Sequence, residues 1–119
     1  MPLLYETYSP AVEVARKTIH YVITPLVTPK GTITRIDPPD GSYIAPNSSF
    51  ACVIWFRNDT SETFTFTTQF IAKGVKTGMT YFNVKSAPAT IGPGAERPMS
   101  SGTKKMPSED VEMTIIVLT

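Results

Sequence analysis

The side chains of this sequence that could carry out catalysis are few. It holds one histidine, His20, and one cysteine, Cys52. A nucleophilic triad or a histidine-rich metal site needs more imidazole than this. Cys52 alternates with Phe50 and Ile54, which is typical of a small buried hydrophobic residue and not of an activated thiol. We therefore expect no internal disulfide and no catalytic residue at either position.

The carboxylates do not form a recognisable site either. The aspartates of the middle region lie at turns, where aspartate is favoured for its backbone hydrogen bonds, and their spacing matches no calcium loop. The glutamates fall in expected loops or on expected exposed faces, so we interpret them as solvated surface charge. These residues are Asp37, Asp40, Asp59, Glu13, Glu62, Glu96, Glu109 and Glu112. The sequence thus predicts a protein that is not an enzyme and has no cofactor and no metal site.

Aromatic side chains offer a binding alternative. Trp55, with Tyr43 or Tyr81, could stack on a sugar ring if that face of the sheet were open. This defines the alternative function, a carbohydrate- or cell-surface-binding accessory module. Two glycosylation sequons begin at Asn47 and Asn58, but such triplets arise often by chance, and the turn preference of asparagine alone explains both. Whether either asparagine is modified stays open.

Composition sets the class of protein. A chain of 119 residues with formal net charge +1 has room for one domain and gives no reason to expect nucleic acid as a partner. Eleven prolines favour short elements separated by loops. The longest apolar runs, 50–56 and 115–118, are too short to span a bilayer. The first residues lack the basic region of a Sec signal, so we expect none.

Alternating residues predict strands from position 31 onward. Ser49–Asn58 is apolar on both faces and should be a central strand, whereas Thr63–Ala72 alternates inward phenylalanines with outward threonines. We expect these two to form an antiparallel hairpin. Other strands are expected at Gly31–Asp37, Met79–Lys85, Ala89–Ile91, Pro98–Lys105 and Val111–Leu118. The expected fold is all-β, an immunoglobulin-like antiparallel β-sandwich of about seven strands over residues 31–119.

Residues 1–30 form an N-terminal arm or an additional strand. Their pattern leaves helix and strand open over residues 9–24, and the β-branched residues and nearby prolines favour an extended structure over 17–27. So much apolar surface must cover the same domain or a neighbouring subunit, for instance by adding a strand to an open sheet edge. The candidate assembly residues are Leu3, Leu4, Tyr5, Tyr8, Ile19, Tyr21 and Ile23.

The layout from position 31 resembles immunoglobulin-like domains of the cell-adhesion-related (CARDB) or fibronectin-III-like type. The residues that carry the resemblance are Ile33–Asp37 before two prolines, Pro46–Ser49 leading into Phe50–Phe56, Asn58, Ile91–Gly94, Met106-Pro107 and Val111–Leu118. It covers about three quarters of the chain, and none of its motifs is specific. The resemblance implies a structural, adhesive or accessory domain, of a kind also found in viral and extracellular structural proteins.

Together these features predict a non-enzymatic structural subunit that self-assembles into a particle or filament. A virion or phage structural protein is the first interpretation, because a sandwich of extracellular type here lacks both a disulfide and a Sec signal. The expected partners are copies of the same chain or other structural subunits, with a glycan as a lesser alternative. The expected location is a virion or extracellular assembly, with the cytoplasm as the alternative.

Overall fold

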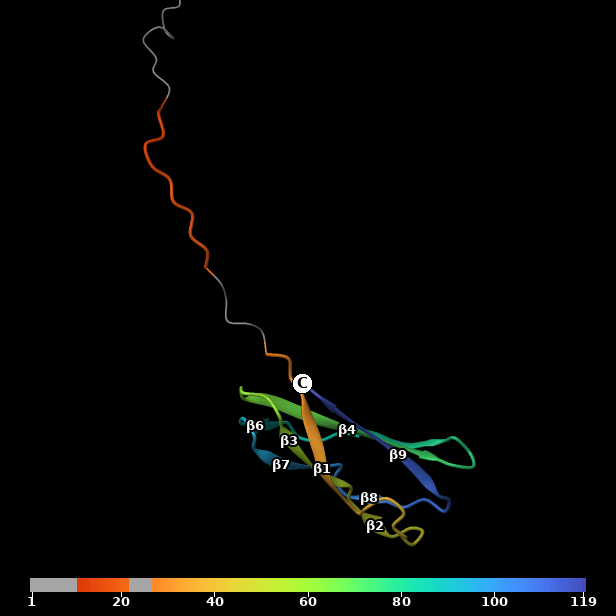
Figure 1. Ribbon diagram of the computed structural model, residues 1–119. Helices are drawn as coiled ribbons and strands as arrows, with labels where there is room; N and C mark the ends of the chain where they lie inside the picture. The colour runs from red at the N-terminus through yellow and green to blue at the C-terminus, as the bar shows by residue number, and fades with distance from the viewer. Residues whose placement is uncertain (1–10, 22–26) are drawn as a thin grey trace, which may run out of the picture.

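The computed structural model describes residues 11–21 and 27–119, and within these ranges all regular elements are strands (Figure 1). This confirms the predicted all-β class. Seven strands are three residues or longer and two are two-residue bridges. They are β1 (Gly31–Asp37), β2 (Ser49–Phe50), β3 (Val53–Asn58), β4 (Phe64–Gly74), β5 (Thr80–Lys85), β6 (Ala89–Ile91), β7 (Glu96–Ser100), β8 (Lys104–Lys105) and β9 (Val111–Leu118).

The first sheet places β3 between β1 and β7, with both pairings antiparallel. This central position was expected, because the strand is apolar on both faces. Ile54 and Phe56 are buried on the inner face, whereas Val53 and Trp55 are half-buried on the outer face. The predicted strand is interrupted at residues 51–52, where the chain leaves the short pairing of β2 with β8 and enters β3.

The second sheet is built around β4, the longest strand. One side of β4 pairs with β9 along residues 67–74. The other side pairs with β6 near its start and with β5 near its end. All three pairings are antiparallel, and β9 is an edge strand of this sheet within the described part of the chain.

The predicted hairpin between Ser49–Asn58 and Thr63–Ala72 is wrong, because β3 and β4 belong to different sheets. The turn between them carries the chain across, and Asn58 holds that turn in place. Its side-chain amide donates hydrogen bonds to the carbonyl oxygens of Glu62 (2.7 Å) and Ile91 (2.8 Å). Its side-chain oxygen accepts hydrogen bonds from the backbone amide (2.9 Å) and the hydroxyl (2.6 Å) of Thr60.

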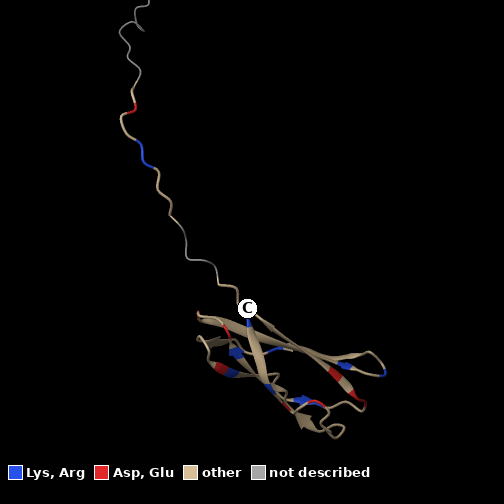
Figure 2. Cartoon of the chain, viewed as in Figure 1, with Lys and Arg blue, Asp and Glu red and all other residues tan. Residues whose placement is uncertain are grey.

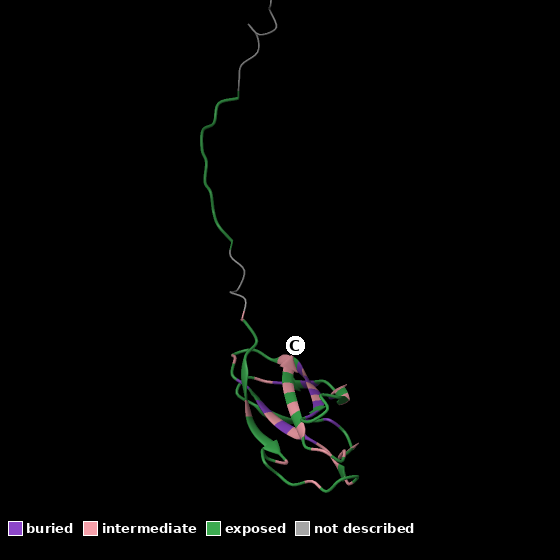
Figure 3. Ribbon diagram, turned by 90° about the vertical axis from the view of Figure 1, so that its right-hand side faces the viewer, coloured by how far each residue is buried: buried purple, intermediate pink, exposed green. Residues whose placement is uncertain are grey.

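The two sheets share one hydrophobic core. The ring of Phe56 from β3 lies 4.8 Å, centroid to centroid, from that of Phe66 in β4. Ile54, Phe70 and Ile91 are fully buried beside them. In Figure 3 most buried residues lie on strands of the two sheets, whereas β1 is exposed along most of its length. The inward-facing phenylalanines of β4 were correctly predicted, because period-2 alternation records which face of a strand is covered.

Residues 11–21 form neither a helix nor a paired strand, and every one of them is exposed (Figure 3). The helical interpretation of residues 9–24 is therefore wrong for this described stretch. Positions 9–10 and 22–24 lie outside the described residues. The sequence left an arm, an additional strand and a helix open for this region. Residues 11–21 agree with the arm, because they are extended and unpaired in the described structure.

Candidate functional site

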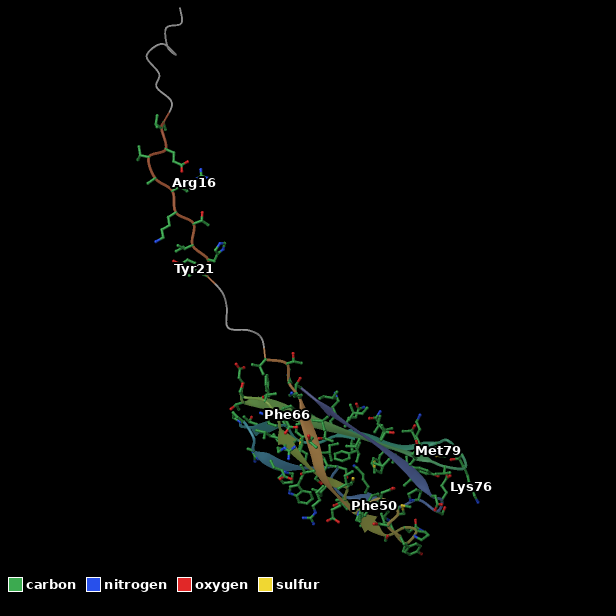
Figure 4. The ribbon with its side chains drawn as sticks, viewed as in Figure 1. Arg16, Tyr21, Phe50, Phe66, Lys76 and Met79 are labelled. Carbon is green, nitrogen blue, oxygen red and sulfur yellow. The ribbon has the colours of Figure 1, made fainter. Side chains whose placement is uncertain are left out.

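The N-terminal arm presents large apolar side chains to solvent. The exposed fractions are 78% for Val12, 93% for Val14, 55% for Ile19 and 90% for Tyr21. Within this stretch the guanidinium of Arg16 donates two hydrogen bonds of 2.8 Å to the carboxylate of Glu13, and both are local to the arm. Of the predicted assembly residues, Ile19 and Tyr21 are described and exposed (Figure 4 labels Tyr21). Leu3, Leu4, Tyr5, Tyr8 and Ile23 lie outside the described residues.

Ile19 and Tyr21 alternate with Thr18 and His20. In an extended chain this spacing places the two apolar side chains on one face and the polar pair on the other. Such a face suits a strand that is covered on one side, and it is unfavourable in water because the apolar surface stays hydrated. Residues 17–21 therefore have the alternating pattern of a sheet strand, but they pair with no strand of the described domain.

A hollow of about 540 Å³ opens on the domain where β1 begins and β9 ends. Its walls include Gly31 and Ile33 from β1 and Val117 from β9, and the buried rings of Phe56 and Phe66 contribute to its lining. In Figure 1 the C-terminus lies beside the start of β1, and in Figure 4 the label of Phe66 marks this end of the domain.

A second hollow of about 680 Å³ lies near the opposite ends of the same two strands. Ile36 from β1 faces Met113 and Ile115 from β9 across it, and Phe50 and Cys52 also line it. Phe50 marks this end of the domain in Figure 4. The two hollows thus follow one side of the molecule, between two strands that run in opposite directions.

Glu109 is the most strongly perturbed carboxylate of the described chain. Tyr81 and Thr77 donate their hydroxyls to it, and the backbone amides of Lys76 (2.9 Å) and Thr77 (3.2 Å) donate as well. These hydrogen bonds, first that of Tyr81 and then those of Thr77, lower the pKa of Glu109 from 4.5 to about 2. The same hydrogen bond raises the pKa of Tyr81.

Glu109 therefore acts as an anchor within the domain. It fastens the loop between β4 and β5 to the segment just before β9, where the amide of Val75 also donates to the carbonyl of Asp110 at 2.9 Å. A Cβ at position 74 would overlap the carboxylate of Glu109, so a larger residue there would displace this carboxylate from its hydrogen bonds. The expectation that Glu109 is simply solvated is wrong. Its partners lie 28 to 33 positions away in sequence, so no local pattern identifies them.

We expect Glu109→Gln to remove a pH dependence of stability. Because the folded pKa lies below the ordinary value, the carboxylate stabilises the fold fully above about pH 4.5, and this contribution is lost as the pH falls towards 2. Urea unfolding between pH 6 and pH 2 should show a difference between wild type and variant that shrinks with falling pH. Glu112→Gln, which removes an exposed charge but leaves these hydrogen bonds, should keep the wild-type pH profile. A constant difference for Glu109→Gln would contradict the anchor.

The aromatic residues of the carbohydrate alternative lie on different elements. Trp55 is on the outer face of β3, Tyr43 is in the loop after β1, and Tyr81 is on β5 in the other sheet. The guanidinium of Arg35 covers the Trp55 ring at 4.5 Å from its centroid. A sugar stacking on Trp55 would have to displace this cation, and Tyr81 is held by Glu109.

The remaining candidate groups have structural contacts. Cys52 is buried, and burial, followed by the nearby charge of Asp37, raises the pKa of its thiol, which is the opposite of an activated nucleophile. Asn58 is fully buried with its amide hydrogen-bonded, so this sequon is inaccessible in the folded domain. Asn47 is exposed and adopts a φ of 63° in a turn, a conformation that asparagine tolerates well. In residues 11–21 and 27–119, no three His, Cys, Asp or Glu side chains gather as a metal site would need.

Charges of both signs are spread over the domain, as Figure 2 shows for the described residues. The arm itself carries Glu13, Arg16 and Lys17, of which the first two form an ion pair. The described part of the chain contains no helix that is long and apolar enough to cross a membrane.

Comparison with protein-family models, with curated proteins and with solved structures gives no match for this chain. The resemblance to CARDB or fibronectin-III-like domains therefore stays a prediction.

Proposed function

We propose that this chain is a non-enzymatic structural subunit that assembles with copies of itself through its N-terminal arm. The observation that carries the proposal is the exposure of Val12, Val14, Ile19 and Tyr21 on a stretch that pairs with no strand of the described domain. Apolar surface of this extent is unfavourable in water and marks an interaction site. A second copy of the chain is the simplest partner, because it is present wherever the first one is.

The finer fold assignment belongs to this proposal. We propose that the two sheets form an immunoglobulin-like sandwich of the CARDB or fibronectin-III-like type. The order β1-β3-β7 corresponds to strands A, B and E of that arrangement, and β4 flanked by β9 corresponds to strands C and F. Domains of this architecture are used widely as building blocks, which supports a structural role and identifies no particular one.

A virus or phage particle is our first candidate for the assembly, with an extracellular filament of the same subunit as the related case. The near-zero net charge supports contact with protein subunits and not with nucleic acid. The arm gives each subunit one donated element, which is enough to join a series of identical copies.

Light scattering of the full chain at rising concentration tests this function. We expect the mean mass to rise well above the 13.0 kDa of a single chain, and negative-stain microscopy of the same sample to show particles or filaments of repeating units. A monomer that persists to the highest soluble concentration would contradict the proposal.

A further inference from the structure

We propose that the acceptor for the arm is the groove between β1 and β9, and that its occupant is residues 17–24 of a second copy, added as a strand along the free edge of β9. This inference deepens the proposed function and rests on it. It follows from the edges that border the groove, the core exposed inside it, and the pattern and length of the arm.

Two free strand edges border the groove. In the described part of the chain β1 pairs with β3 alone, and β9 pairs with β4 alone. The edge of each strand that faces the other thus presents unpaired amide and carbonyl groups, which is the template that an added strand requires. The hollows of about 540 and 680 Å³ lie between these edges at their two ends.

The core beneath the groove is incompletely covered. Met113, Ile115 and Val117 lie on the inner face of β9 and pack against the buried cluster, yet each is only half-buried. Their counterparts on the central strands, Ile54 of β3 and Phe70 of β4, are fully buried. The inner residues of an edge strand are covered only where another element closes the sheet. The described part of the domain therefore lacks the apolar side chains that would cover Met113, Ile115 and Val117 on this side.

The topology indicates that the missing element is a strand G. In the immunoglobulin arrangement that we propose, one sheet continues from strand F to a strand G, which lies along the outer edge of F. Here β9 occupies the position of F, and no described strand lies beyond it. The groove is the place that strand G would fill.

The arm has the pattern and length of that strand. From residue 17 to residue 24, Ile19, Tyr21 and Ile23 alternate with Thr18, His20, Val22 and Thr24. One face would enter the groove and the other, largely polar, would remain outside. Eight residues in extended form span about 26 Å, and β9 is also eight residues long.

A second copy suits the groove better than the chain's own arm. The arm joins the domain at the start of β1, the end where β9 finishes (Figure 1). An arm folding back on its own domain would have to reverse direction between residues 24 and 31 and would run parallel to β9. The arm of another copy can run antiparallel to β9, which is the more stable pairing and the direction of a strand G. Its own domain then lies beyond the far end of the groove, so the copies join head to tail.

Two full-chain variants test the assignment. The donor variant, Ile19→Asp with Tyr21→Asp, keeps the groove and loses the apolar face of the arm. The acceptor variant, Ile36→Arg, keeps the arm and places a charge in the groove. Ile36 and Ile116 are 39% and 38% exposed, but Ile116 is not among the residues that line either hollow. Ile116→Arg is therefore a matched control for the acceptor variant.

We expect the acceptor variant to remain a monomer at concentrations at least about tenfold, and the donor variant at least about a hundredfold, above those at which wild type and Ile116→Arg assemble. Mixed in equal amounts, the two variants should form a complex of two chains and no larger species. In this complex the intact arm of the acceptor variant fills the intact groove of the donor variant. Assembly stops there, because the remaining arm and the remaining groove both carry substitutions. Urea unfolding of each variant checks that it is folded.

The outcomes separate the two proposals. If wild type assembles and Ile36→Arg assembles equally well, or if the folded variants fail to pair when mixed, the groove is not the acceptor, while self-assembly stands. If wild type itself does not assemble, the proposed function fails, and the acceptor assignment fails with it.

Discussion

Replacing Ile19 and Tyr21 with aspartate should raise the concentration needed for assembly at least about a hundredfold. An apolar side chain of this size contributes about 2 kcal/mol when it is buried, and each 1.4 kcal/mol corresponds to a factor of about ten in affinity. Both residues are exposed in the single chain, so their loss costs the folded domain nothing. The measurement is light scattering of the variant and wild type over the same concentration series.

Val12→Asp with Val14→Asp is the matched control, since it adds the same charge to the same arm. These valines are as exposed as Ile19 and Tyr21 but precede residues 17–24. We expect less than about a tenfold change for this pair, equivalent to less than about 1.4 kcal/mol. Equal effects of the two double substitutions would mean that assembly responds to the charge of the arm and not to a strand at 17–24.

Asn58→Ala should lower the free energy of unfolding by about 3 kcal/mol. The substitution removes four hydrogen bonds at a fully buried position and leaves the carbonyl oxygens of Glu62 and Ile91 without their side-chain donor. A buried polar group that loses its partner costs about 1–3 kcal/mol, which makes this one of the larger single effects expected in the domain. Urea unfolding at neutral pH measures it.

Asn83→Ala provides the control for Asn58. Asn83 also uses its side chain in a hydrogen bond, accepting from Gln69 at 2.7 Å, but on the exposed surface. We expect a loss below about 0.5 kcal/mol there. A loss below about 1 kcal/mol for Asn58→Ala would show that the turn between the two sheets does not depend on this side chain.

The strands could be predicted from the sequence because alternation directly records burial. Gly31–Asp37, Ala89–Ile91 and Val111–Leu118 have the predicted bounds, and the burial of Phe66 and Phe70 follows from the same periodicity. Pairing could not be predicted in the same way. Two neighbouring strands joined by a polar turn resemble a hairpin, but β3 pairs with β1 and β7 and β4 pairs with β5, β6 and β9, all distant in sequence or not identifiable from local alternation.

Of the two parts of the candidate site, the sequence predicted the arm and not the groove that accepts it. The exposed apolar pattern of Ile19 and Tyr21 is visible in the sequence, so the arm could be named as the assembly element. Its acceptor could not, because β1 and β9 are separated by more than seventy positions and meet across the groove only in the folded domain. No sequence pattern records an unpaired edge, since an edge strand and a paired strand can have the same alternation.

Hydrogen exchange of the full wild-type chain, measured above and below its assembly concentration, shows whether the arms join the subunits. If arms pair with neighbouring subunits, amides in residues 17–24 and in β9 should gain protection together on assembly, while amides in β7 should be unchanged. Unpaired backbone exchanges rapidly, so the gain in the arm should be large. If the arm of the assembled protein exchanges as fast as it does in the monomer, the arm does not join the subunits.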